Sequence, residues 1–201
     1  MNEKVFRFPL FAEAVWPQAG LVREIILVLV GSWLVALTAQ IVVPLWPVPI
    51  TGQTFGALLV GALLGKKRGA TSLLLYLGQG AVGLPVFAGG TAGIAKLAGP
   101  TGGYLVGLVV VAWVVGWLSE RGWDRRIATA VAAMLIGNIS IYVFGLPWLA
   151  NFVGWGAVLR VGLIPFIVGD VLKIALAGLA LPWGRALVRA KGRKSGSDLE
   201  S

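Results

Sequence analysis

The sequence predicts an all-α integral membrane protein with six transmembrane helices and both termini in the cytoplasm. The first reason is composition: 58% of the residues are hydrophobic, 12% are charged and the mean hydropathy is +0.88, outside the usual balance of soluble domains. The second is length, since 201 residues leave room for about six helices of ~20 residues each. The third is that basic residues gather in alternate loops. We therefore expect a multi-pass protein of the cytoplasmic (inner) membrane, surrounded by membrane lipids.

Six apolar runs, separated by turn or charge signals, are the candidate spans. The second and third runs are short, and the Pro- and Gly-rich stretches beside them, 44–51 and 84–103, are typical of loops folded back onto a membrane protein. We divide the chain into an N-terminal cytoplasmic or interfacial segment (1–21), a six-helix membrane domain (22–183) and a basic, then polar, cytoplasmic tail (184–201). The candidate spans are residues 22–43, 51–65, 69–84, 102–119, 127–149 and 157–183.

The basic residues indicate how the six spans are oriented. One group lies before or at the start of the first span, and others follow the second, fourth and sixth spans. The remaining basic residues are Lys96 and Arg160 in the opposite loops and Lys173 inside the last span. Because loops rich in Lys and Arg stay in the cytoplasm, both termini are expected there. The stretch "GALLGKKRG" (61–69) lacks the glycine spacing of a phosphate-binding loop and is predicted to be a cytoplasmic turn.

The chain contains no Cys and no His. This excludes disulfides, thiol nucleophiles, histidine general bases and Cys/His zinc sites, and we expect no catalytic residue, no metal and no cofactor. The net charge of +9 is explained by basic loops facing an anionic leaflet, so we exclude nucleic acid as a partner. The sequence has no ATPase motif, and uphill transport would need a partner or an ion gradient.

Asp170 is the only one of the eight acids that lies in the interior of a predicted span, since Glu24 stands at the cytoplasmic start of the first span. An isolated charge at the bilayer centre costs at least ~2.5–3.5 kcal/mol, which makes an ionisable residue there a candidate functional residue. Lys173 follows three residues later and projects from the same helix face. If the last helix begins near Pro165, Asp170 lies ~8 Å and Lys173 ~12 Å from its outer end. This predicts a ligand pocket near the outer face, with a structural ion pair as the alternative.

Other polar side chains lie on or beside the outer halves of the remaining spans. Each one alone is explained by a hydrogen bond between membrane helices. As a set, they suit a pocket for a small polar solute with apolar walls. These residues are Gln53, Thr54, Tyr76, Gln79, Tyr104, Asn138 and Tyr142.

Small residues recur at a spacing of four, as in the pair Ser32 and Ala36 of the first span. This spacing allows two helix backbones to approach closely. If the pair faces the protein interior, it serves packing, whereas on an exposed face it forms a docking surface for another membrane subunit. Ser32 and Ala36 are therefore candidate docking residues, with internal packing as the alternative.

Four segments resemble the signature blocks of the BioY biotin transporters, the substrate-binding S components of energy-coupling factor (ECF) transporters. They occur in matching order from Pro47 to about Ala180, roughly two-thirds of the 201 residues. The resemblance implies high-affinity binding and uptake of biotin through an outer pocket closed by the loop between the first two spans. It also implies association with a transmembrane coupling subunit and a pair of cytoplasmic ATPases, which alone use ATP. The four segments are "PVPITGQTFGALLVGALLGKKRGA", "YLGQGAVGLPVFAGG", "GPTGGYLVG" and "PFIVGDVLKIALA".

In that family an Asp and a Lys of the last helix are the central binding residues, and they match Asp170 and Lys173. The ureido ring of biotin has two N–H donors and a carbonyl acceptor, which suit a carboxylate and an ammonium group. Lys173 can serve either the ureido carbonyl or the carboxylate of biotin, and we favour the carbonyl because the depth of Lys173 matches that of Asp170. Apolar cover for the thiophane ring is expected from Phe87, Trp46 and Val86. The full set of predicted ligand-binding residues is Asp170, Lys173, Gln53, Tyr76, Gln79, Phe87, Tyr104 and Asn138.

The sequence departs from the family pattern at two positions. Gly52 stands where family members often have a bulky aliphatic residue, and Lys96 has no counterpart in the pattern. Lys96 either attracts the biotin carboxylate or is solvated. The first span has Ser32 and Ala36 where S components commonly carry Ala-xxx-Ala for binding the coupling subunit.

Two other functions compete with a transport subunit. A membrane enzyme acting on a lipid or isoprenoid needs paired carboxylates, a nucleophile with its base, or metal ligands, whereas this chain has one intramembrane acid and no His or Cys. A stand-alone ion-coupled carrier of biotin or a similar small vitamin would use Asp170 as its protonatable group. Such carriers usually contain repeated halves, and no repeat relates the first three spans to the last three. We therefore expect a transport subunit and not an enzyme.

Overall fold

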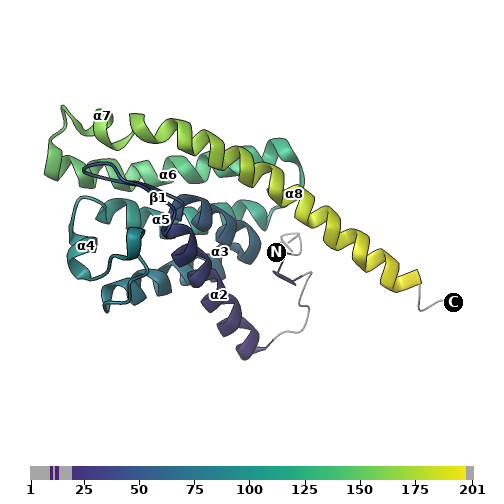
Figure 1. Cartoon of the computed structure of the whole chain (residues 1–201). Coiled ribbons are helices and arrows are strands. Elements are labelled where there is room, and N and C mark those ends of the chain that lie inside the picture. Colours follow the sequence, from purple (N-terminus) through teal and green to yellow (C-terminus); the bar gives the residue numbers. More distant parts are fainter. Residues whose placement is uncertain (1–9, 11, 14–19, 198–201) are drawn as a thin grey trace, which may run out of the picture.

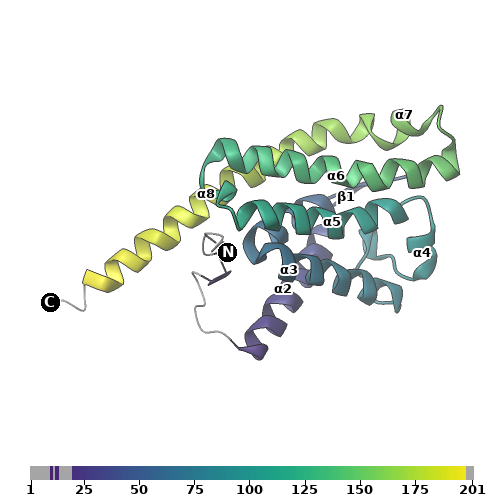
Figure 2. The same cartoon turned by 180° about the vertical axis from the view of Figure 1, so that it is seen from behind.

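The computed structural model describes residues 10, 12–13 and 20–197, of which 180 and 184–197 are described by their backbone alone. The long helices lie side by side in an elongated bundle (Figures 1 and 2). The predicted interfacial segment 1–21 falls largely outside the described residues. In chain order the elements are α2 (Leu21–Ala39), β1 (Val42–Val43), β2 (Ile50–Thr51), α3 (Gln53–Ala81), η1 (Ala88–Gly90), α4 (Ile94–Ala98), α5 (Gly102–Ser119), η2 (Trp123–Arg125), α6 (Ile127–Val153), α7 (Val158–Gly162), η3 (Ile164–Phe166) and α8 (Ile167–Ser197).

Four stretches of the described chain are long and apolar enough to cross a membrane. They are α2, α5, α6 and the stretch Val158–Trp183, which runs from α7 into α8, and they correspond to the first, fourth, fifth and sixth predicted spans. The second and third predicted spans form the two arms of α3, which is bent at Gly65. Each arm is shorter than the ~20 residues of an ordinary transmembrane helix.

Gly65 allows α3 to bend back on itself. Its backbone angles are φ 84° and ψ 175°, a region that glycine enters readily and L side chains rarely adopt. The two arms then touch through further glycines, because a Cβ built on Gly69 would lie only 3.1 Å from the Cα of Gly61. The turn predicted within residues 61–69 is therefore confirmed.

The structure corrects two predicted boundaries. The first span was expected to reach residue 43, but α2 ends at Ala39, and Val42–Val43 form the strand β1, which pairs antiparallel with β2, Val42 opposite Thr51. The last span was expected to start at residue 157, but the 3-10 turn η3 separates α7 from α8, which begins at Ile167, close to the Pro165 start assumed for the last helix. Pro165 lies in this turn and has no N–H to donate to a continuous helix. The backbone of α8 continues to Ser197, through most of the predicted tail (Figure 1).

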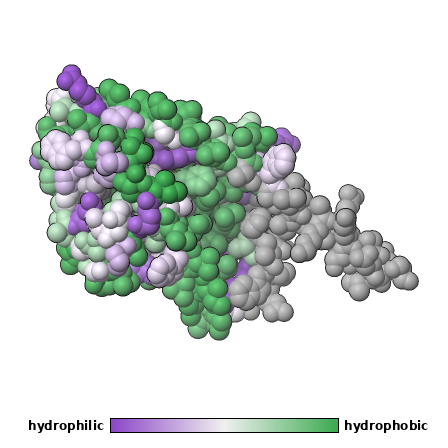
Figure 3. All heavy atoms as spheres, viewed as in Figure 1, coloured by the Kyte–Doolittle hydropathy of each residue, from purple (hydrophilic) through white to green (hydrophobic). Residues whose placement is uncertain are grey.

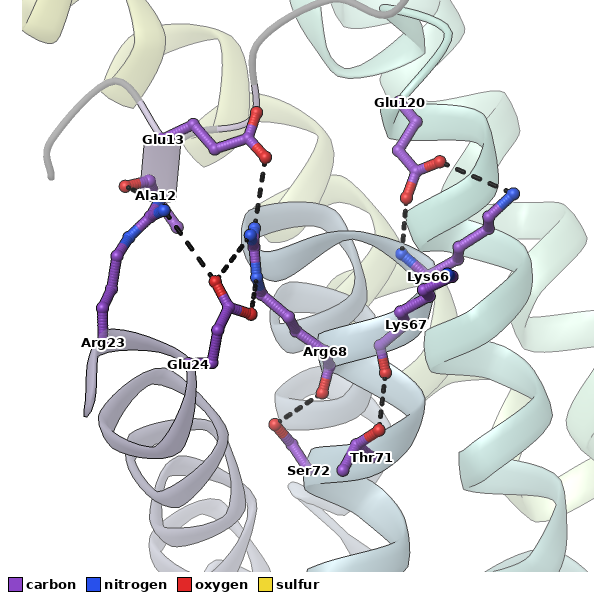
Figure 4. A network of polar contacts seen from close by, with 10 residues as sticks. All are labelled: Ala12, Glu13, Arg23, Glu24, Lys66, Lys67, Arg68, Thr71, Ser72 and Glu120. Carbon is purple, nitrogen blue, oxygen red and sulfur yellow. Dashed lines mark hydrogen bonds and ion pairs between the residues drawn. The ribbon is translucent and has the colours of Figure 1, made fainter. Parts of the chain in front are cut away.

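Charged residues gather at one end of the bundle, where α2 begins and α3 bends (Figure 4). Arg68 donates to both carboxylate oxygens of Glu24 at 2.6 and 2.9 Å and to Glu13 at 3.2 Å. Glu120, just after α5, accepts a hydrogen bond of 3.1 Å from the backbone N–H of Lys66. The N-terminal segment, the bend of α3 and the segment after α5 were all predicted to lie on the cytoplasmic side of the membrane, and they meet at one end of the molecule. We call this the ion-pair end; its members are Glu13, Glu24, Lys66, Arg68 and Glu120.

Apolar side chains cover the outside of the bundle as well as its core. Val35, Leu58 and Val111 are fully buried between α2, α3 and α5, whereas Leu21 and Val168 are 77% and 81% exposed. Figure 3 shows hydrophobic residues over much of the visible surface, with most of the hydrophilic ones toward the end that carries α4 and α7. Helices that are apolar on both faces are typical of proteins in a lipid environment.

Candidate functional site

A cavity of about 640 Å³, its open mouth included, lies at the end of the bundle opposite the ion-pair end. The first arm of α3 and α5 both begin at this cavity and reach the ion-pair end at Lys66 and Glu120. We call this the cavity end. The lining residues are Val48, Pro49, Thr51, Gln53, Thr54, Phe87, Ala88, Lys96, Thr101, Tyr104, Leu105, Leu108, Asn138, Ile141, Tyr142, Phe166, Asp170 and Lys173.

Asp170 is the centre of the polar part of the cavity. Its Oδ2 accepts hydrogen bonds from Asn138 Nδ2 at 2.9 Å and from the Tyr142 hydroxyl, two donors that lie four residues apart on α6. Its Oδ1 lies 3.6 Å from Lys173 Nζ, one turn along α8. Both side chains of this ion pair are mostly buried, 8% and 14% exposed. The two donors on α6 hold the carboxylate of Asp170 in place through Oδ2. The contact between Oδ1 and Lys173 is longer, so Oδ1 is the carboxylate oxygen that is more available to a ligand.

Three aromatic rings form one wall of the cavity. Phe166 stacks on Tyr104 with ring centroids 6.3 Å apart and an interplanar angle of 21°, and Tyr142 meets Tyr104 edge-on at 6.3 Å. The Tyr104 hydroxyl donates a 2.8 Å hydrogen bond to the carbonyl of Gly162 in α7. This bond fixes the ring although α5 and α7 are far apart in sequence. The cavity thus combines a charged pair with an aromatic surface that suits a flat or ring-shaped ligand.

Lys96 brings a second cation to the cavity. It lies in the short helix α4, is partly buried and lines the cavity. This position is compatible with the first of its two predicted roles, contact with a ligand, which stays a prediction. With Asp170, Lys173 and Lys96 among its lining residues, the cavity has one more positive than negative formal charge, which favours an anionic ligand.

Six of the eight predicted ligand-binding residues line the cavity together: Asp170, Lys173, Gln53, Phe87, Tyr104 and Asn138.

Tyr76 and Gln79 are the other two, and the structure places both outside the lining. Tyr76 is fully buried behind Gln53, whose Nε2 donates to the Tyr76 hydroxyl at 2.5 Å. Gln79 faces α2 and accepts a 2.6 Å hydrogen bond from Ser32. Both lie on the second arm of α3, which does not contribute to the cavity. Neither residue is in position to contact a ligand in this structure.

Ser32 and Ala36 are not on an exposed face, which corrects their selection as docking residues. Ser32 is 0% and Ala36 4% exposed, and Ser32 is hydrogen-bonded to Gln79. The small-residue spacing on α2 therefore serves the alternative role, close packing against α3.

The apolar cover predicted for a ligand ring is only partly present. Phe87 lines the cavity, but Val86 is buried elsewhere in the core and Trp46 is 86% exposed at the tip of the β1–β2 hairpin. Gly52 also has a structural explanation, because a Cβ there would overlap the backbone carbonyl of Thr38 at the end of α2.

Comparisons with known proteins place this chain in a family. A model of the BioY family matches residues 6–190. The chain belongs to the BioY family. It is 41% identical over 155 residues to the probable biotin transporter BioY of Pyrococcus horikoshii, covering 77% of this chain and 91% of that protein. It is 42% identical over 150 residues to the biotin transporter BioY of Rhizobium etli, covering 71% and 79%.

A solved structure supports the same relationship. The S-component for biotin from an ECF-type ABC transporter superposes on this chain with a TM-score of 0.70 at 25% identity, covering 82% of this chain and 92% of that one. The family predicted from the four sequence blocks is confirmed. Membership of a transporter family, together with several apolar helices, identifies this BioY protein as a multi-pass membrane protein.

The sequence interpretation missed part of the BioY cavity. Phe166, Thr51 and Thr101 line it but were not selected. Phe166 follows Pro165, where the last helix was expected to begin, and this was the one available signal. Thr51 ends β2 and Thr101 immediately precedes α5; both lie in Pro/Gly-rich stretches and have no distinguishing pattern of their own.

Proposed function

We propose that this protein is the biotin-binding S component of an ECF-type transporter and not an enzyme. The observation that carries the proposal is the arrangement of Asp170 and Lys173 beside the aromatic wall of the cavity. Family membership supplies the candidate ligand. The protein is expected to need no cofactor of its own, with ATP used by its partner subunits.

The ureido ring of biotin complements the polar part of the cavity. Its N–H groups would donate to the carboxylate of Asp170, and its carbonyl would accept from Lys173. Asn138 and Tyr142 already hold Oδ2 of Asp170, so the carboxylate would need little reorganisation to accept the ligand. The wall formed by Tyr104, Tyr142 and Phe166 would cover the fused ring system.

Lys96 is assigned to the carboxylate at the other end of biotin. We predict that Lys96→Ala weakens binding of biotin about tenfold, the scale of one partly solvated charge pair. Binding of the neutral primary amide of biotin should change less than about twofold. Calorimetry with both ligands measures the difference. Arg160→Ala is the matched control, because Arg160 is an exposed basic residue in α7 outside the cavity lining. Equal losses for the acid and the amide would contradict the assignment.

The cavity end is proposed to face outward and the ion-pair end to face the cytoplasm, with both termini cytoplasmic and the two arms of α3 completing six spans. The basic residues around Arg68 and Arg121 lie toward the ion-pair end, whereas Lys96 and Arg160 lie in α4 and α7 at the cavity end (Figure 1). This distribution agrees with the preference of basic loops for the cytoplasm of the inner membrane. Short arms within α3 can be accommodated by local thinning of the bilayer and by flanking side chains that extend to the membrane interface.

Dependence on partner subunits distinguishes an S component from a stand-alone ion-coupled carrier. We predict that a host without ECF coupling subunits accumulates labelled biotin only after a coupling subunit and the ATPase pair are co-expressed. ATP depletion should then abolish accumulation. Uptake by the chain alone that collapses with the proton gradient would support the carrier instead. Asp170→Asn is the control for uptake that does not pass through the cavity.

A further inference from the structure

Tyr76 connects two residues of the cavity without touching the cavity itself. The side chain is 0% exposed in the second arm of α3. Its hydroxyl accepts a 2.5 Å hydrogen bond from Gln53 Nε2. Its ring meets the ring of Phe87 edge-on, with centroids 5.5 Å apart and an interplanar angle of 78°. Gln53 and Phe87 both line the cavity, one from the start of α3 and one from the loop before η1.

The hydrogen bonds of Gln53 fix which way its amide points. While Nε2 donates to Tyr76, Oε1 accepts a 3.0 Å hydrogen bond from Thr51 Oγ1. The terminal amide of a glutamine rotates easily when it is free, and the two partners select one orientation. Without the Tyr76 hydroxyl, Gln53 would keep only Thr51 to orient it.

Gly80 supplies the space that the Phe87 ring occupies. It lies one turn after Tyr76 on the same arm, and a Cβ built on it would overlap the ring atoms of Phe87. The carbonyl of Gly80 also accepts a 2.7 Å hydrogen bond from the N–H of Gly93, which ties the η1–α4 loop to α3. Phe87 is 1% exposed and lines the cavity, so a methyl group on Gly80 would push its ring against packed neighbours or into the cavity.

We propose that Tyr76 and Gly80 are positioning residues: they form a seat on the second arm of α3 that sets the amide of Gln53 and the ring of Phe87 toward the ligand. This inference rests on the proposed binding of biotin in the cavity. The second arm of α3 contributes no residue to the cavity lining. According to this proposal, it nevertheless affects the affinity of the cavity for biotin.

A double-mutant cycle tests the role of Tyr76. Tyr76→Phe removes the hydroxyl and keeps the ring against Phe87. It should weaken biotin binding about five- to tenfold in the wild-type background, the scale of losing a partner of a buried polar group. In a Gln53→Ala background the same change should weaken binding less than about twofold, because the amide it orients is absent. Equal losses in the two backgrounds, or no loss in the wild type, would overturn the proposal for Tyr76.

A second cycle tests Gly80. Gly80→Ala should weaken biotin binding at least about tenfold, since the added methyl group would displace the Phe87 ring from its place in the cavity wall. Phe87→Ala removes the overlap, and Gly80→Ala should then change the affinity less than about twofold. A loss that persists without the Phe87 ring would overturn the proposal for Gly80. If Gly80→Ala yields no folded protein alone but folds with Phe87→Ala, the rescue itself supports the seat.

Ser32→Ala is the matched control for both cycles. It removes another buried hydroxyl that bonds a glutamine, Gln79, across α2 and α3 but away from the cavity. It should lower the melting temperature and leave biotin affinity within about twofold. If Ser32→Ala weakens binding as much as Tyr76→Phe, the effect is general destabilisation and the proposal is overturned. A wild-type protein that fails to bind biotin would instead contradict the proposed function.

Discussion

Asp170→Asn is expected to weaken biotin binding at least about 100-fold, equal to about 2.8 kcal/mol. The substitution preserves size but removes the charge and one of the acceptors that the ureido N–H groups need. It also leaves Lys173, 3.6 Å away and mostly buried, without its anionic partner, and removing one member of such a pair costs about 2–5 kcal/mol. Calorimetric titration of the purified variant measures the loss.

Glu120→Gln is the matched control for this variant. Glu120 is also a mostly buried carboxylate with a lysine partner, Lys66 at 3.7 Å, but it lies at the ion-pair end. Its substitution should affect thermal stability and leave biotin affinity within about twofold. If Asp170→Asn binds biotin as tightly as the wild type, the pair of Asp170 and Lys173 is a structural ion pair, the alternative noted from the sequence.

Gly65→Ala is expected to lower the free energy of unfolding by at least about 2 kcal/mol, since a non-glycine residue at φ 84° and ψ 175° carries backbone strain of about 1–3 kcal/mol. The added Cβ would also lie 2.5 Å from Leu10 and 3.0 Å from Glu120 Oε1. Leu10 can rotate away, but Glu120 is hydrogen-bonded to the backbone of Lys66. Thermal unfolding in detergent should show a melting temperature lower by several degrees.

Gly78→Ala controls for the loss of a glycine within the same helix. Gly78 lies in the second arm of α3, and a Cβ there would meet nothing within 4 Å. Because alanine is the better helix former, this variant should be neutral or more stable by up to about 1 kcal/mol. Equal melting temperatures for the two variants would mean that the bend does not require glycine.

The sequence was sufficient to predict features that depend on the chemical type of the residues and on their order along the chain. A charge pair in an apolar helix singled out Asp170 and Lys173 because burying charge is expensive, and the structure places both in the cavity. The run "GALLGKKRG" predicted the turn at which α3 bends. The helices were located by hydropathy, with errors where a short strand pair and a 3-10 turn replace helix.

Features that depend on which helix faces which could not be predicted. The spacing of Ser32 and Ala36 indicates that they share a face but not whether α3 or another subunit covers it, and α3 does. Tyr76 has the same kind of polar ring as Tyr104, yet only Tyr104 reaches the cavity. The difference arises because the second arm of α3 folds behind the first, and this depends on packing between residues distant in sequence.

Titration of the purified wild-type protein with biotin by isothermal calorimetry tests the proposed function most directly. The cavity with its preformed Asp170 site predicts saturable binding of one biotin per chain, with a dissociation constant in the nanomolar range. Absence of saturable binding by protein that is folded and free of copurified biotin would contradict it.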